Sequence, residues 1–147
     1  MRYKTNTTRH IRRVRRGATT LELACILPVV LTMLLGTIDV ARVMYAYGTV
    51  SEAARTGARY AMVHGARSGS PCGPAANNAS VTTVVKNNAL ALDPTNLTVT
   101  STWANGSNKA TSPVTVTATY TCYLSIGQLV GLSSVTVRGS TTAEITY

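Results

Sequence analysis

Phenylalanine is absent from this chain of 147 residues, and acids and histidines are scarce. There are five acids and two histidines, and beyond residue 65 the acids are only Asp93 and Glu144, with no histidine. A catalyst needs a nucleophile with a base, or paired carboxylates, and this region offers neither arrangement. We therefore predict no catalytic residue, no metal site and no cofactor, and we expect a chain that assembles with partners rather than an enzyme.

Positive charge is abundant but confined to the first residues. The formal net charge is +9, yet seven of the 14 basic residues precede Gly17, with no acid among them. From Ala18 onward, seven basic and five acidic residues leave a balance of only +2. A basic stretch can bind nucleic acid, but here an apolar segment follows at once, which favours a role in membrane orientation. We expect no nucleic-acid partner and a cytoplasmic N-terminus.

A long uncharged segment follows the basic residues. No charge occurs from Leu23 to Ile38, and the slightly longer range 21–40 reaches about 30 Å as a helix, which matches a bilayer core. A secretory signal peptide is the competing interpretation, but its small-residue cleavage site would follow the apolar run instead of preceding it. The sequence predicts a retained membrane helix over 18–40, preceded by an unstructured basic leader at 1–17.

The helical pattern continues over 41–64. Two acid–base pairs three residues apart, Asp39 with Arg42 and Glu52 with Arg55, can each meet on a helix surface. An apolar stripe at intervals of three and four residues runs along the same segment. We therefore expect an extracytoplasmic continuation of the membrane helix.

Small residues gather within this continuation, where they allow a neighbouring helix or the head's own sheet to approach closely. Arg55 and Arg59, four residues apart on one face, have two interpretations: contact with acidic groups of a partner, or simple solvation of the helix. The predicted helix-packing residues are Ala54, Gly57, Ala58 and Ala61.

Residues 65–147 predict a small strand-rich head. Glycines and prolines break the chain at 65–78, and a short helix is expected within 79–92. Alternating segments predict antiparallel strands at 97–103, 114–122 and 134–147, the last with a bulge near Gly139. The predicted fold class is α+β, with a long N-terminal helix, partly transmembrane, packed on a small C-terminal antiparallel sheet.

The chain has three cysteines. Cys25 lies in the apolar segment and is expected to pack as a small apolar residue. Cys72 and Cys122 fall in the head, which the predicted orientation places outside the cytoplasm, where disulfides form. We expect an intramolecular Cys72–Cys122 disulfide; two unpaired thiols, or pairing between molecules, are the alternatives.

Two motifs carry a family resemblance. Gly17-Ala-Thr-Thr-Leu-Glu22 looks like a type IV prepilin cleavage site, with glycine before the cut and glutamate at the fifth mature position. Residues 17–61, including Ile38-Asp-Val-Ala-Arg42 and Ala53-Ala-Arg-Thr-Gly-Ala-Arg-Tyr-Ala61, resemble TadE-like proteins. These are minor pilin-like components, or pseudopilins, of tight-adherence pilus systems.

The resemblance implies cleavage between Gly17 and Ala18 by a separate prepilin peptidase, so that the chain is a substrate and not an enzyme. It also implies that Glu22 pairs with the new α-amino group of Ala18, in its own or a neighbouring subunit. The alternative for Glu22 is snorkelling to the membrane interface near a helix N-terminus, which the helix dipole favours.

We therefore expect a minor pilin-like subunit in the bacterial inner membrane, crossing it once with its C-terminal domain in the periplasm and possible incorporation into the pilus. Its partners would be the prepilin peptidase, other pilin-like subunits, the inner-membrane assembly platform and the lipid bilayer. A head of about 80 residues favours a minor over a major subunit. The alternative is an uncleaved, membrane-anchored periplasmic structural protein.

Overall fold

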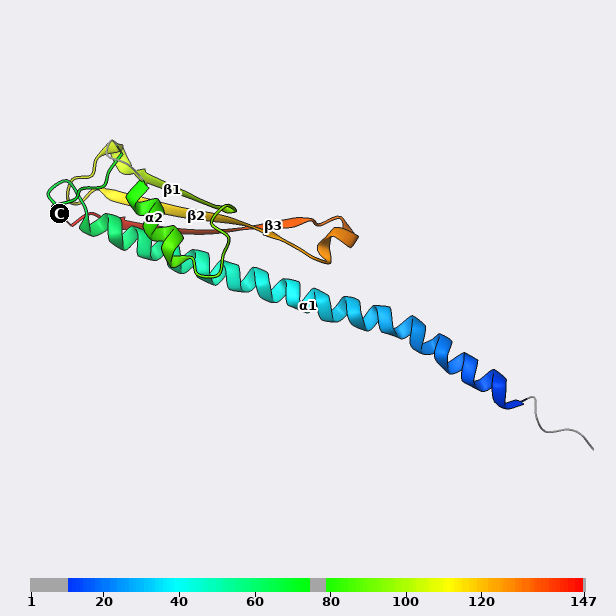
Figure 1. Cartoon of the computed structure of the whole chain (residues 1–147). Coiled ribbons are helices and arrows are strands. Elements are labelled where there is room, and N and C mark those ends of the chain that lie inside the picture. The colour runs from blue at the N-terminus through cyan, green and yellow to red at the C-terminus, as the bar shows by residue number, and fades with distance from the viewer. Residues whose placement is uncertain (1–10, 75–78, 147) are drawn as a thin grey trace, which may run out of the picture. The chain divides into compact units, whose positions relative to one another are not determined.

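A computed structural model describes residues 11–74 and 79–146 (Figure 1). The chain divides into two compact units, Met1–Ile38 and Asp39–Tyr147. One helix, α1 (Ile11–Val63), contributes to both. It begins six residues before Gly17, so the expectation of an unstructured leader is wrong for 11–17, while 1–10 lie outside the described residues.

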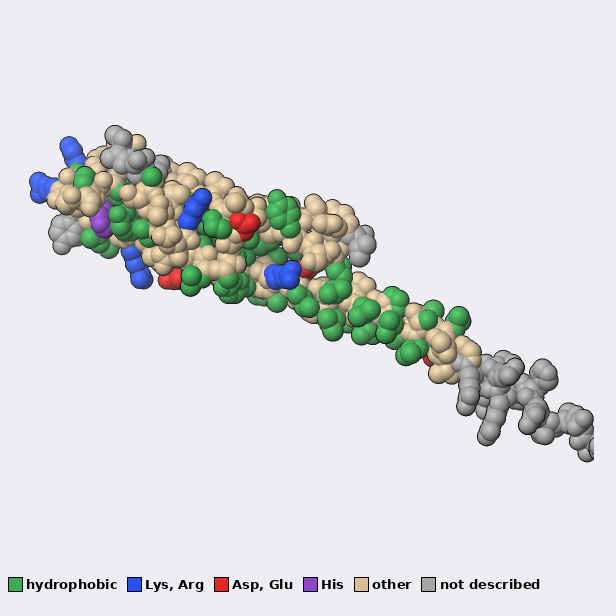
Figure 2. All heavy atoms as spheres, in the orientation of Figure 1, with side chains coloured by type: hydrophobic (Ala, Val, Ile, Leu, Met, Phe, Trp, Pro, Cys, Tyr) green, Lys and Arg blue, Asp and Glu red, His purple; other side chains and the backbone are tan. Residues whose placement is uncertain are grey.

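The first unit contains the N-terminal part of α1. Its large apolar side chains are exposed along the whole segment from Leu21 to Ile38, and Figure 2 shows them on the visible face of the helix. This helix is long and apolar enough to cross a membrane. Pro28 lies inside it, and the Thr32 hydroxyl donates to the Pro28 carbonyl at 2.7 Å, so that this polar group has a partner within the helix.

The second unit is a helix–sheet sandwich. The C-terminal part of α1 and the short helix α2 (Ala79–Asn88) accompany a three-stranded antiparallel sheet in the order β1-β2-β3. The strands are β1 (Leu97–Trp103), β2 (Pro113–Tyr123) and β3 (Ser134–Glu144). The predicted α+β class, with a long helix packed on a small antiparallel sheet, is confirmed.

Alternation along β2 separates the two faces of the sheet. Val114, Val116 and Ala118 are fully buried, whereas the intervening threonines are only partly buried. On that second face, hydroxyl pairs join β2 to β3, with 2.9 Å between Thr115 and Thr142. Because alternate residues of a strand point to opposite faces of the sheet, one face packs on the helices and the other is turned toward solvent.

The core between helix and sheet is built from small side chains. The largest fully buried residues are valines and Cys72. A Cβ added at Gly57 would meet side chains of Val81 and Val85 on α2 and of Val116 on β2. Gly57 therefore marks the point where α1, α2 and the sheet lie closest together.

Gly139 on β3 marks a second close approach between the sheet and α1. The register of β2 and β3 is continuous through the Ala118–Gly139 pair, so the predicted bulge is wrong. A Cβ on Gly139 would lie 2.8 Å from the Ser51 Cα and 3.0 Å from the Val50 carbonyl oxygen. The glycine is there because the helix backbone touches the strand, not because the strand is bulged.

We predict that Gly139→Ala destabilises the head by about 1–3 kcal/mol, because the new methyl group meets backbone atoms that cannot rotate away. Gly48→Ala is the matched control, since nothing lies within 4 Å of a Cβ there and the position is helical. It should be neutral or stabilising by up to about 1 kcal/mol. Denaturant unfolding of the detergent-solubilised chain followed by circular dichroism measures both; equal stabilities would contradict the contact.

Candidate functional site

The predicted processing site lies within α1. Gly17, Ala18 and Glu22 are all exposed, and no side chain that the structure describes lies within 4 Å of a Cβ built on Gly17. Ala18 and Glu22 are four residues apart, which on a helix places them about one turn, or 6 Å, from each other along the axis. Among the side chains described, Glu22 makes no ion pair.

The predicted helix-packing residues face the chain's own head. Ala54, Gly57, Ala58 and Ala61 are buried on the side of α1 that carries the core. Because these side chains are small, α2 and the sheet can pack closely against α1, and at Gly57 valines of both elements fill the space that a Cβ would take. The sequence left two kinds of partner open, a neighbouring helix or the head's sheet, and in the structure this stripe packs against both α2 and the sheet.

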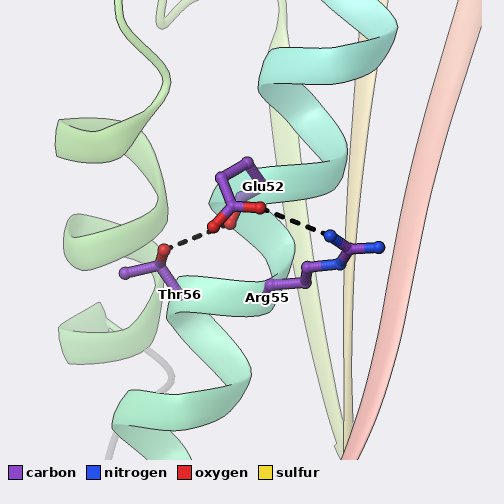
Figure 3. A network of polar contacts seen from close by, with 3 residues as sticks. All are labelled: Glu52, Arg55 and Thr56. Atoms are coloured by element: carbon purple, nitrogen blue, oxygen red, sulfur yellow. Dashed lines mark hydrogen bonds and ion pairs between the residues drawn. The ribbon is translucent and has the colours of Figure 1, made fainter.

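Arg55 and Arg59 lie on the opposite, exposed face of α1. Arg55 forms an ion pair with Glu52 at 3.5 Å, as predicted, and the Thr56 hydroxyl donates to the Glu52 backbone carbonyl at 3.1 Å (Figure 3). Both charged side chains are more than 60% exposed, so solvent screens the pair and its contribution to stability is small. This charged cluster on α1 faces outward.

Asp39 has a role that the sequence did not reveal. Its side chain is only 6% exposed, and its carboxylate accepts a hydrogen bond of 2.9 Å from the backbone N–H of Ile126, 87 residues away. The expected ion pair between Asp39 and Arg42 is not formed within 4 Å. Arg42 is exposed and interacts with Asp39 only through longer-range electrostatic attraction. Asp39 therefore ties the connection between β2 and β3 to the start of the second unit. The identity of its partner follows only from this contact between residues far apart in the chain.

The predicted Cys72–Cys122 disulfide is not present, because the structure holds both cysteines as free, buried thiols. Cys72 lies beside Asn108, whose side-chain amide donates to the Cys72 carbonyl at 3.3 Å, just ahead of β2. Cys122 lies near the far end of the same strand, nine residues beyond Pro113. That stretch spans roughly 30 Å, whereas the Cα atoms of a disulfide lie within about 7 Å.

The ring of His64, the histidine nearest the two head cysteines in the sequence, is engaged by Tyr60. Its Nδ1 lies 2.9 Å from the Tyr60 carbonyl oxygen, its ring stacks on the Tyr60 ring with centroids 3.9 Å apart, and its own carbonyl accepts from the Cys72 N–H. In the part of the chain that the structure describes, no three His, Cys, Asp or Glu side chains gather as metal ligands do.

Comparison with known proteins supports the resemblance. The family model described as TadE-like protein matches residues 17–59, so the predicted similarity to this family is confirmed over that segment. TadE-like proteins are structural components associated with tight-adherence pili, and the matched segment includes the apolar part of α1. No curated protein and no solved structure matches the chain significantly.

We predict that Asp39→Ala speeds hydrogen exchange at the Ile126 amide by roughly tenfold or more, because the N–H loses its charged acceptor. Glu52→Ala removes an equal charge from the same helix without touching this loop, and should leave the exchange rate of Ile126 unchanged. Exchange measured by NMR on both variants tests the contact. Similar protection of Ile126 in Asp39→Ala and in the unmodified chain would contradict it.

We also predict three free thiols in the protein purified without reductant. Burial raises the pKa of the Cys72 and Cys122 thiols, so both should react slowly with iodoacetamide at neutral pH while the chain is folded. In denaturant all three cysteines should be alkylated, which intact mass shows as three added groups. A single added group would instead reveal a disulfide.

Proposed function

We propose that the chain is a minor pilin-like subunit of a tight-adherence, type IV-like pilus, cut after Gly17 by a prepilin peptidase. The observation that carries this proposal is the division of α1. Residues 21–38 expose apolar side chains all along the helix, while the continuation of the same helix is built into the head. A subunit stored in a membrane and then moved into a filament needs both a lipid-compatible segment and a folded head.

The surroundings of Gly17 suit a cleavage site. A peptidase binds the chain around the scissile bond in an opened backbone conformation, so it has to unwind α1 locally. Glycine weakens a helix interior by up to about 1 kcal/mol relative to alanine, and here no side chain packs against it. The basic residues that precede Gly17 would keep the bond at the cytoplasmic face.

Cleavage would give Glu22 a partner. A carboxylate within a bilayer costs about 2.5–3.5 kcal/mol at the centre and less near an end, so an unpaired Glu22 disfavours burial of the segment. Cleavage gives Ala18 a cationic α-amino group one helical turn away. Pairing with that amine, in the same or a neighbouring subunit, lowers the cost and couples processing to assembly.

The exposed face of α1 in the head supplies a second contact surface. The buried stripe is already used by α2 and the sheet, so a neighbouring subunit meets the opposite face, with Glu52, Arg55 and Arg59. The resemblance to TadE-like proteins adds the inner-membrane assembly platform and other pilin-like subunits as the expected partners.

Intact mass and N-terminal sequencing of the membrane-extracted protein test the processing step. We predict a mature chain that starts at Ala18 in cells with an active pilus system. A chain that still starts at Met1 there would instead leave an uncleaved, membrane-anchored periplasmic protein.

The same cells test Glu22 separately. We predict that Glu22→Gln is inserted and cleaved but reaches sheared filaments in amounts reduced by about tenfold or more, because the amine loses its counter-charge. Glu52→Gln is the control, because it removes an acid from an exposed position in the head. This variant should reach the filaments in normal amounts. Equal incorporation of both variants would show that Glu22 has no part in assembly.

A further inference from the structure

A groove of about 530 Å³ opens in the second unit, next to the beginning of its helix. Its walls come from α1, from the segment that leads from α2 to β1, and from the end of β2. Much of the lining is apolar, with a few polar groups that converge on the opening, as in sites that bind small molecules. The polar side chains are Arg42, Asp93, Asn96 and the tyrosines 45, 120 and 123.

Three of these six polar side chains, Asp93, Asn96 and Tyr45, have hydrogen-bond partners, whereas Arg42 has only the nearby charge of Asp39. The side-chain amide of Asn96 donates to the Asp93 carboxylate at 3.4 Å. Asp93 accepts from the backbone N–H of Thr95 at 2.9 Å and from its hydroxyl at 2.7 Å, and these bonds lower the pKa of Asp93 and hold it in its own turn. The Tyr45 hydroxyl donates to the Leu90 carbonyl at 3.2 Å. Among the described residues, no hydrogen bond or ion pair engages the guanidinium of Arg42.

The position of the groove along the chain limits what can reach it. Arg42 is four residues beyond Ile38, where the exposed apolar segment ends, so their Cα atoms lie at most about 14 Å apart in any conformation. If residues 21–38 cross a bilayer, the Arg42 side chain is held in the layer of lipid headgroups. Tyr45 and Tyr123, each more than half exposed, are of the residue type that favours this layer.

We propose that this groove binds the phosphodiester of an anionic phospholipid headgroup, with Arg42 as its charged donor. A guanidinium presents paired N–H groups that match two phosphate oxygens. The hydroxyl of Tyr123 and the second N–H of the Asn96 amide, whose first N–H donates to Asp93, add neutral donors at the same opening. The first carbons of the lipid lie against Leu92 and Ala41. The site requires only that residues 21–38 span a bilayer, and it does not depend on cleavage or on pilus assembly.

The test uses the full chain in detergent micelles and NMR titration with dihexanoylphosphatidylglycerol. We expect saturable shifts of the amides of Tyr45, Asn96 and Tyr120. Arg42→Gln should weaken the apparent affinity by at least tenfold, whereas Arg42→Lys, which keeps the charge, should retain saturable binding. Arg59→Gln is the matched control, because it removes one exposed charge from α1 outside the groove, and it should bind as the unmodified chain does.

Two further ligands distinguish the possible sources of the phosphate group. Dihexanoylphosphatidylcholine carries the same phosphodiester beside a cation, so it should bind more weakly, and inorganic phosphate should shift the same amides only at much higher concentration. Inorganic phosphate acting as strongly as the lipid would make this a site for a soluble anion and overturn the proposal. Equal losses in Arg42→Gln and Arg59→Gln, or no saturable shift with any ligand, would overturn it as well.

Discussion

Close approach between the backbone of α1 and the sheet is the constraint on which the second unit depends. Its largest fully buried side chains are valines and a cysteine, and these bury little apolar surface each. Such a core is well packed only if the elements lie close together, which the absence of side chains at Gly57 and Gly139 permits. The stability of the head therefore depends on shape at a few contacts as well as on larger buried side chains such as Trp103 and Leu97.

This constraint also determines how α1 is divided between its two tasks. A helix stripe of alanines and one glycine that packs on its own sheet is unavailable to neighbouring subunits. In the proposed assembly, the surfaces of α1 that remain for contacts between subunits are the exposed apolar side chains of 21–38 and the charged face that bears Glu52, Arg55 and Arg59. The two tasks therefore use different parts of one helix, and a substitution in one part need not disturb the other.

The local patterns of the sequence predicted the regular elements well. Alternation identified all three strands to within a few residues, and spacing of three identified the Glu52–Arg55 pair. Both signals are local, since a period of two or of 3.6 is visible in a short window. The motif around Gly17 and Glu22 likewise lies in one segment, and the match to TadE-like proteins covers that segment.

The failures concern contacts between residues far apart in the chain. The sequence predicts a bulge at Gly139 because a strand pattern does not show the α1 backbone that packs against it. It predicts an Asp39–Arg42 pair because the hydrogen-bond partner of Asp39 is 87 residues away. The number of cysteines does not show that Cys72 packs beside the segment ahead of β2, whereas Cys122 lies near the far end of that strand. Even so, Asp39 carried a local signal.

A carboxylate placed directly after an uncharged stretch is costly in a membrane, so its presence requires a partner beyond that stretch. The Ile126 amide is that partner. It lies in the head, outside the apolar segment, so the bond favours a position for Asp39 at the membrane surface. If this segment crosses a bilayer, as its length and composition permit, the uncharged residues that end at Ile38 define how far the helix can enter it.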